Sequence, residues 1–405
     1  MPSTAYLVRH FRRNRAVALH PHLRCRLPLV REHAQRDAGW FAPRLESREA
    51  PGHPDSLLAW LALTRLEGLG PVHLARLLER FGSPTGVFDA PLSALHDPSL
   101  GLRALHIAAL SRGPDLEWAC AQAARAEELG AAIVAIDDPQ YPSCLRAIHA
   151  PPPVLHVLGC VPLWQEHSVG VVGTRAPSGV GGEACGELAR SWARSGLRIV
   201  SGLARGIDEI AHRAALEAGG ETVAVLGCGL DQIDSSSRRA LARDISCRGA
   251  LVSEFPFGEE VHKGNFPRRN RVVAGLSRAV VVAEAGERSG ALITARHALE
   301  QGREVLACPG PAGWPSFAGC HRLLREGAAL CAAPGDLFDA LGWENKPPRP
   351  CDDTLLNLLT GQGATIEEIA IKTGRTIRDI QCQIVLRELS GDVLRTASGR
   401  WRRRG

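Results

Sequence analysis

The order of apolar and polar residues divides the chain into a helical segment and a longer segment in which strands alternate with helices. Residues 56–135 are predicted to form the helical segment. The stretch LLAWLALTRLEGLGPVHLARLLERFG contains two amphipathic helical periods, interrupted at Gly68-Leu69-Gly70, and Pro71 is expected to open the second helix. The pattern is similar to a helix-hairpin-helix or SAM-like domain. Because no basic residue accompanies the glycine turn, a plain helical hairpin is the favoured interpretation.

The segment from about residue 136 to 342 shows the second pattern. Amphipathic helical stretches such as 184–196 and 207–220 separate short apolar runs rich in β-branched residues. Continuous apolar strands that alternate with helices are typical of a parallel sheet covered on both faces. The sequence therefore predicts an α/β domain with an extended Rossmann-like parallel sheet. Its strands are expected at 168–173, 197–202, 222–227, 249–254, 279–285, 304–310 and 329–333.

The two ends of the chain differ from these segments. Residues 1–55 are rich in arginine and lack periodicity, and we interpret them as a disordered extension or a wrongly assigned start. Residues 343–352 form a polar, proline-rich linker. Residues 353–405 are predicted to form a winged-helix-like domain with a basic end around Trp401. Such a domain binds either nucleic acid or another protein, and the sequence does not separate these roles.

Composition narrows the class of protein. No apolar run approaches the roughly 20 residues that span a bilayer, so no membrane association is expected. The twelve cysteines are scattered and form no CxxC pair, which favours a reducing cytoplasm and no metal site. The net charge is +5, but residues 1–55 alone hold ten arginines against five acidic residues. The remainder of the chain is therefore neutral overall, and any anion site there must be a local cluster.

Candidate chemistry gathers at the carboxyl ends of the predicted strands, where open parallel sheets bind their ligands. Small residues, hydroxyls and arginines recur at these ends, and two of the following helices begin with hydroxyl or glycine residues. Glycines allow close backbone approach, arginines donate to phosphate oxygens, and free N–H groups at helix starts favour anions. The sequence thus predicts a shared anion site made of Gly173, Thr174, Arg175, Ser201, Gly202, Arg205, Ser289, Gly290 and Thr294.

The stretch FPRRNRVVAGLS supplies further candidates. It is predicted to form a helix from about Arg269 that leads into the apolar strand 279–285. Arginines at a helix N-terminus oppose the helix dipole, so an anion near Arg269 and Arg271 would compensate their cost. Phe266 is the nearest aromatic side chain available for stacking on a base.

Two alternatives use the same region. An NAD site is rejected, because the strand at 197–202 ends in Ser201-Gly202 and not in an acidic residue. A nucleotide or nucleoside-phosphate hydrolase remains open, with Asp208, His212 and either Glu254 or Glu284 as acid–base groups. The chain shows no nucleophile elbow, Walker lysine or metal-ligand spacing. Binding without a cofactor or catalysis is therefore the preferred interpretation.

The motifs of this segment resemble those of the DNA-processing protein A (DprA/Smf) family. The matching stretches, in order, are DDPQYPSCL, PPPVLHVLG, VGTRAPSGVG, SGLARGIDEIAH, AVLGCGLD, SEFPFG, FPRRNRVVAGLS, EAGERSGALITARHALEQGREVLACPG and GAALC. The resemblance covers about residues 55–340. The chain departs from the family pattern at Val180, where a tyrosine is usual, and at Asp234-Ser235, where a Tyr-Pro pair is common. These departures remove stacking or shaping groups.

The resemblance implies a protein that binds single-stranded DNA, forms a homodimer and loads the RecA recombinase during natural transformation and recombination. Single-strand-binding protein is a further expected partner. No catalytic activity is implied. By motif position, the resemblance assigns DNA contacts to Arg175, Arg205, Arg269 and Arg271, with the glycine and hydroxyl residues of the predicted anion site as backbone or hydroxyl contacts.

Overall fold

The computed structural model describes residues 54–343, apart from 67 and 160–166. It also describes shorter stretches between 358 and 403. The linker predicted at 343–352 and the extension predicted at 1–55 lie almost entirely outside the described residues. None of the described helices is both long enough and apolar enough to cross a membrane.

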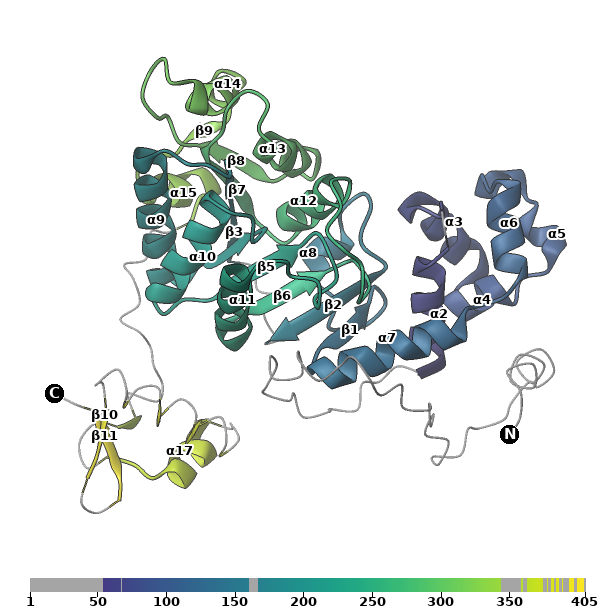
Figure 1. The fold of residues 1–405 in the computed structure, drawn as a ribbon, viewed down its shortest axis with the longest axis horizontal. Coiled ribbons are helices and arrows are strands. Elements are labelled where there is room, and N and C mark those ends of the chain that lie inside the picture. The colour runs from purple at the N-terminus through teal and green to yellow at the C-terminus, as the bar shows by residue number, and fades with distance from the viewer. Residues whose placement is uncertain are drawn as a thin grey trace. The chain divides into compact units, whose positions relative to one another are not determined.

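A nine-stranded sheet, in the order β1-β2-β6-β5-β4-β3-β7-β8-β9, forms the centre of the fold (Figure 1). In this sheet order, each pair of neighbouring strands from β6 through β5, β4, β3, β7 and β8 to β9 is parallel, as the apolar sequences predict. β2 is antiparallel to both of its neighbours, which the sequence did not indicate. The strands are β1 (Ala132–Ala135), β2 (Val154–Gly159), β3 (Ser168–Gly173), β4 (Arg198–Ser201), β5 (Thr222–Leu226), β6 (Ala250–Ser253), β7 (Ala279–Glu284), β8 (Glu304–Ala307) and β9 (Ala329–Leu330).

Helices cover both faces of the sheet, because successive strand residues point to opposite faces. In β7, Val280 and Val282 belong to one buried cluster, whereas Val281 belongs to the other. The first cluster is closed by α8 (Ser143–Arg146), α12 (Asn265–Gly275), α13 (Ala291–Glu300) and α14 (Ala318–Arg325), and the second by α9 (Gly179–Arg194), α10 (Ile207–Glu217) and α15 (Gly335–Leu341). α11 (Ser236–Arg248) contacts β2, β5 and β6.

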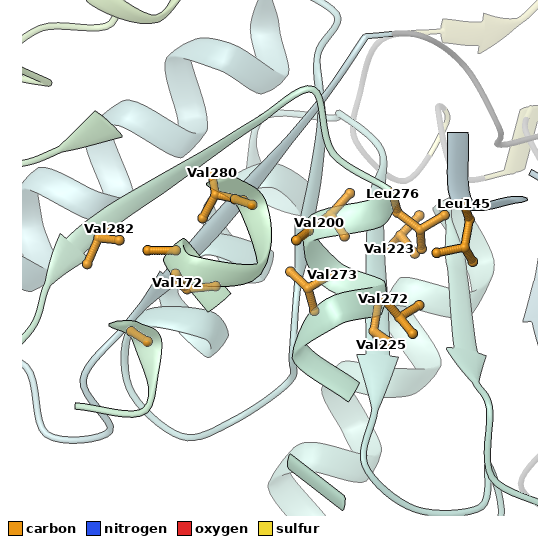
Figure 2. Packing of buried hydrophobic residues seen from close by; sticks show 14 of the residues in the cluster. Leu145, Val172, Val200, Val223, Val225, Val272, Val273, Leu276, Val280 and Val282 are labelled. Atoms are coloured by element: carbon orange, nitrogen blue, oxygen red, sulfur yellow. The ribbon is translucent and has the colours of Figure 1, made fainter. Parts of the chain in front are cut away.

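The apolar side of α12 lies in the first cluster. Val272, Val273 and Leu276 pack against valines of β4 and β5, including Val200 and Val223 (Figure 2). Helix α12 begins at Asn265, four residues before the start expected from the sequence. This packing fixes the first turn of α12, with its arginines, near the carboxyl ends of β4 and β5.

The helical segment before the sheet consists of α2 (Pro54–Thr64), α3 (Pro71–Phe81), α4 (Pro84–Phe88), α5 (Leu92–Leu95), η1 (Pro98–Leu100), α6 (Ala104–Ser111) and α7 (Leu116–Leu129). The turn between α2 and α3 and the proline at the start of α3 agree with the sequence prediction. The segment is shorter than predicted, since Ala132–Ala135 forms β1 of the large sheet.

The helical segment and the sheet share a buried contact. Gln122 of α7 donates from Nε2 to the carbonyl of Phe257 at 3.2 Å and accepts from the Phe257 N–H at 2.8 Å. Ala135 and Val154, from β1 and β2, also belong to the apolar cluster of the helices. The first two strands therefore serve as the surface on which the helices pack.

Towards the C-terminus, the described residues include α17 (Ile366–Thr373) and a hairpin of β10 (Val393–Arg395) and β11 (Trp401–Arg403). Leu359, Ile369, Val393 and Trp401 are among its buried residues. A helix and a two-stranded hairpin around one apolar cluster are compatible with a winged helix, which stays a prediction.

Candidate nucleic-acid interface at the sheet edge

The strand order places the candidate site at the topological switch point of the sheet. From β3 the chain moves outward through β4, β5 and β6, and it then returns to the other side of β3 for β7. The carboxyl ends of β3 and β7 therefore lie side by side where the winding changes direction, which is where open α/β sheets bind ligands. Thr174, directly after β3, donates its N–H to the carbonyl of Glu284 at 2.8 Å.

Exposed guanidinium groups from two loops meet at this edge. Arg175 follows β3 and Arg205 follows β4, and both side chains are exposed. Nε of Arg205 donates to the carbonyl of Arg175 at 3.2 Å. The guanidinium of Arg175 lies 4.6 Å from the ring centroid of Phe266, in the first turn of α12. A cation–π contact of this kind contributes about 0.5–1 kcal/mol at an exposed site, so it orders the arginine without neutralising it.

The loop between β4 and α10 has an unusual backbone. Leu203 has a φ of 55°, and Gly206 has a φ of 91°. A Cβ on Gly206 would lie 2.5 Å from the Thr174 carbonyl oxygen, so only glycine fits. Oδ2 of Asp208 accepts from the N–H groups of Gly202 and Ala204 at 3.1 and 3.4 Å. These contacts hold the loop in the shape that presents Arg205.

Arg269 of α12 contacts the same loop from inside the domain. Its side chain is buried, with a residue exposure of 4%, and Nη1 donates to the carbonyls of Gly202 and Val225. Burial lowers the pKa of Arg269, and the nearby charge of Asp208 opposes that shift. Burial likewise raises the pKa of Asp208, against the charge of Arg269. Arg269 therefore joins the ends of β4 and β5, and its guanidinium is not displayed at the surface.

Arg271 also has structural partners. Its side chain is 11% exposed and pairs with the carboxylate of Glu254, whose side chain is 2% exposed. Its second nitrogen donates to the carbonyl of Ala150. The neighbouring Arg268 is 60% exposed and lies 3.1 Å from the same Glu254 carboxylate. Among the arginines of FPRRNR, Arg268 is thus the accessible one, although the sequence prediction preferred the other two.

The remaining predicted residues divide into accessible and buried groups. Gly290 is exposed and starts α13, and its carbonyl accepts from Asn270 of α12 at 3.5 Å. Ser289 accepts from the N–H of Ala291 at 3.3 Å. Ser201 is fully buried and donates to the carbonyl of Val171, and Thr294 is also buried. The last two hydroxyls belong to the interior of the domain.

The residues considered for hydrolysis have other partners. Nδ1 of His212 lies 2.6 Å from the Thr222 hydroxyl, and burial lowers the pKa of His212 to about 3. Glu284 accepts from the N–H and hydroxyl of Ser178, the residue that caps α9. Across the described part of the chain, no group of His, Cys, Asp or Glu has an arrangement that suits a metal ion.

Two further contacts belong to this edge of the sheet. A Cβ on Gly227, at the end of β5, would lie 3.4 Å from the ring of Phe266, so the third strand end also contributes. Asp234, which interrupts the family pattern, pairs with Arg238 one helical turn later at 2.7 Å. Its negative charge is therefore offset by the Arg238 side chain from the first turn of α11.

Together, the fold and the site define an open, doubly wound α/β protein with an arginine-bearing carboxyl edge. The model of the family described as DNA recombination-mediator protein A matches residues 132–342. Protein Smf of Synechocystis sp. is 37% identical over 288 residues, which are 70% of this chain and 72% of that protein. The chain belongs to the DNA recombination-mediator protein A family, among whose names are Smf and DprA.

Two further comparisons agree with this assignment. DNA processing protein DprA of Bacillus subtilis is 39% identical over 219 residues, covering 54% of this chain and 74% of that protein. The X-ray structure of DprA from Streptococcus pneumoniae has a TM-score of 0.62 and 34% identity. It covers 69% of this chain and 97% of the solved chain.

Proposed function

We propose that the protein binds single-stranded DNA through the backbone phosphates at the carboxyl edge of its sheet, as a DNA-processing protein. The observation that carries the proposal is the pair of exposed arginines at this edge: Arg205 donates to the Arg175 carbonyl, and the Arg175 guanidinium lies over the ring of Phe266. Guanidinium groups donate in a fork that matches phosphate oxygens. The names of the relatives, DNA processing protein DprA and protein Smf, support the same role.

The binding would have little base preference. Phe266 is the only aromatic among the predicted contacts, and Arg175 already lies over its ring. Contacts would then be mainly electrostatic, and affinity would fall steeply with salt. Arg269 would act indirectly, by holding the loop that carries Arg205. Arg271 would hold α12 in place through Glu254 and the Ala150 carbonyl.

The test is an equilibrium titration of labelled oligo-dT at several salt concentrations. The variant Arg175→Ala/Arg205→Ala should bind more weakly, and its log–log salt slope should be shallower by about 1.4, since each single-strand contact contributes about 0.7. The control is Arg190→Ala/Arg194→Ala, at the far end of α9. Helix α9 starts at the carboxyl edge and runs back, so its last turn lies about 20 Å away along the helix axis. Wild-type binding by the site variant would contradict the proposal.

Loading of the RecA recombinase, exchange with single-strand-binding protein and homodimer formation extend this proposal. Their support is family membership. The deciding measurement is RecA-catalysed strand exchange on strands coated with single-strand-binding protein, together with the mass of the protein in solution. Stimulation that disappears in Arg175→Ala/Arg205→Ala is expected. Equal stimulation by that variant would separate recombinase loading from the sheet edge.

The hydrolase alternative uses Asp208 and His212. Their contacts with backbone N–H groups and with Thr222 favour a structural role. Release of base or phosphate from mononucleotides that is lost in Asp208→Asn would favour the enzyme instead.

A further inference from the structure

The turn between α2 and α3 lies beside basic residues that are distant in sequence. A Cβ built on Gly68 would be 3.1 Å from Nε2 of His106 and 3.2 Å from Nη2 of Arg103, at the start of α6. Nη2 of Arg103 lies 3.3 Å from Nε2 of His106. The rings of His73 and His106 are in edge contact, with centroids 5.1 Å apart. The fold therefore places a guanidinium group, that of Arg103, beside a turn that has no basic residue in its own sequence.

A second arginine joins from α3. A Cβ built on Gly101 would lie 2.8 Å from Nη1 of Arg76, and Nε2 of His73 lies 3.2 Å from the Gly101 carbonyl oxygen. Arg76 and Arg103 are both exposed, as are the two glycines. The hairpin patch, as we name it, consists of Gly68, His73, Arg76, Arg103 and His106. It combines accessible backbone with guanidinium groups from two different elements.

Among the described residues, the arginines of the hairpin patch have no acidic partner. Residues 54–131 contain six arginines and nine acidic residues, so this segment is negative overall. Arg65 and Arg125 form ion pairs with acidic side chains, at 3.0 Å each. Within the described residues, Arg76 and Arg103 form no such pair. Burial lowers the pKa of His106, and the charges of Arg103 and His73 lower it further. His106 is therefore the neutral member of the hairpin patch, and Arg76 and Arg103 carry its positive charge in an otherwise acidic segment.

We infer that the hairpin patch is a second nucleic-acid contact, which binds backbone phosphates independently of the sheet edge. Among the described residues these two guanidinium groups have no acidic partner, and two separate guanidinium groups suit successive phosphates of a strand. Single strands and duplexes carry the same phosphate chemistry. Exposed Val72 and Leu105 flank the cluster, so an acidic protein is the competing occupant that the experiment must exclude.

The experiment titrates the full chain with labelled oligo-dT and with a mixed-sequence duplex over a range of salt. In the variant Arg76→Gln/Arg103→Gln, the slope of log affinity against log salt concentration should become shallower. For two lost contacts the change is about 1.4 on single strands or about 1.8 on duplex. The control is Arg112→Ala, because this exposed arginine caps the opposite end of α6. It should leave the slope unchanged. The probe that responds identifies the preferred form of nucleic acid.

The sheet-edge variant Arg175→Ala/Arg205→Ala is titrated in parallel, and it is also combined in one chain with each of these two variants. If the sheet-edge pair has no effect but the hairpin pair does, the function proposed above fails and the hairpin patch stands. An unchanged slope with both probes, or an equal change in Arg112→Ala, overturns the hairpin patch. Loss of binding to polyglutamate with nucleic-acid binding intact also overturns it, in favour of an acidic protein. Should the double variant melt early, Arg76→Gln alone decides, since Arg76 forms no hydrogen bond among the described residues.

Discussion

Arginines that lie at the same edge of the sheet have very different environments. Arg269 is buried against the carbonyls of Gly202 and Val225, whereas Arg175 and Arg205 are exposed. The sequence predicted all of them as anion contacts. The local sequence around an arginine after a strand or at a helix start is the same whether its side chain is buried or exposed. Burial depends on which strand ends lie beneath the residue. At this scale, the sequence indicated arginines at this edge but did not separate the buried from the exposed ones.

The same loops allow a test of backbone strain. Gly206→Ala places a Cβ against the Thr174 carbonyl at a φ of 91°, which should lower the free energy of unfolding by about 1–3 kcal/mol. Gly179→Ala is the control, because a Cβ there meets nothing within 4 Å. It should be neutral or stabilising by up to about 1 kcal/mol. Denaturant titration measures both, and equal stabilities of the two variants would show that the loop relaxes freely.

At the scale of single elements, α12 shows how far the sequence pattern reaches. The apolar period of RVVAGL indicated a helix leading into a buried strand, and α12 and β7 confirm that order. The pattern placed the helix start four residues late, since Phe266-Pro267 reads locally as a loop. Proline is tolerated in the first helical turn, where its missing N–H has no partner to lose. Sequence therefore predicted the element, and packing against β4 and β5 determined its extent.

The second prediction concerns the ion pairs that Arg268 and Arg271 of α12 form with Glu254, the residue after β6. Arg271→Ala leaves the Glu254 carboxylate, 2% exposed, without its more buried partner and should destabilise the protein by about 3 kcal/mol. Arg268→Ala removes the partner that is 60% exposed and should cost about 0–1 kcal/mol. Chemical denaturation monitored by tryptophan fluorescence distinguishes them. Similar losses for both variants would mean that the two arginines share the carboxylate equally.

At the scale of the whole molecule, buried histidines couple stability to pH. Burial lowers the pKa of His156 to about 4 and that of His212 to about 3. The unfolded chain, with a histidine pKa of about 6.5, binds more protons in this range. Stability from these two groups is therefore complete above about pH 6.5 and is lost as the pH falls. Asp208 acts in the opposite direction, because its raised pKa favours the protonated form in the folded protein.

The third prediction follows from that linkage. Between about pH 6 and pH 4.5, His156→Leu should reduce the slope of unfolding free energy against pH by about 1.4 kcal/mol per unit, the value for one proton. Melting temperature against pH, with ligand-free protein, is the measurement. The matched control is His262→Leu, because His262 is exposed. An unchanged slope in His156→Leu would show that this ring is protonated in the folded protein or is reached by water.

The sequence by itself determined the alternation of buried strands and amphipathic helices, the glycine turns, and the family motifs at the strand ends. These are local properties, since side-chain periodicity and backbone freedom act over a few residues. Only the tertiary structure decided that β2 runs antiparallel, that Ala132–Ala135 joins the sheet, and that Arg269 is buried while Arg175 is exposed. It also brought Arg103 to the glycine turn at Gly68. Each of these depends on contacts between residues far apart in the chain, which no local pattern records.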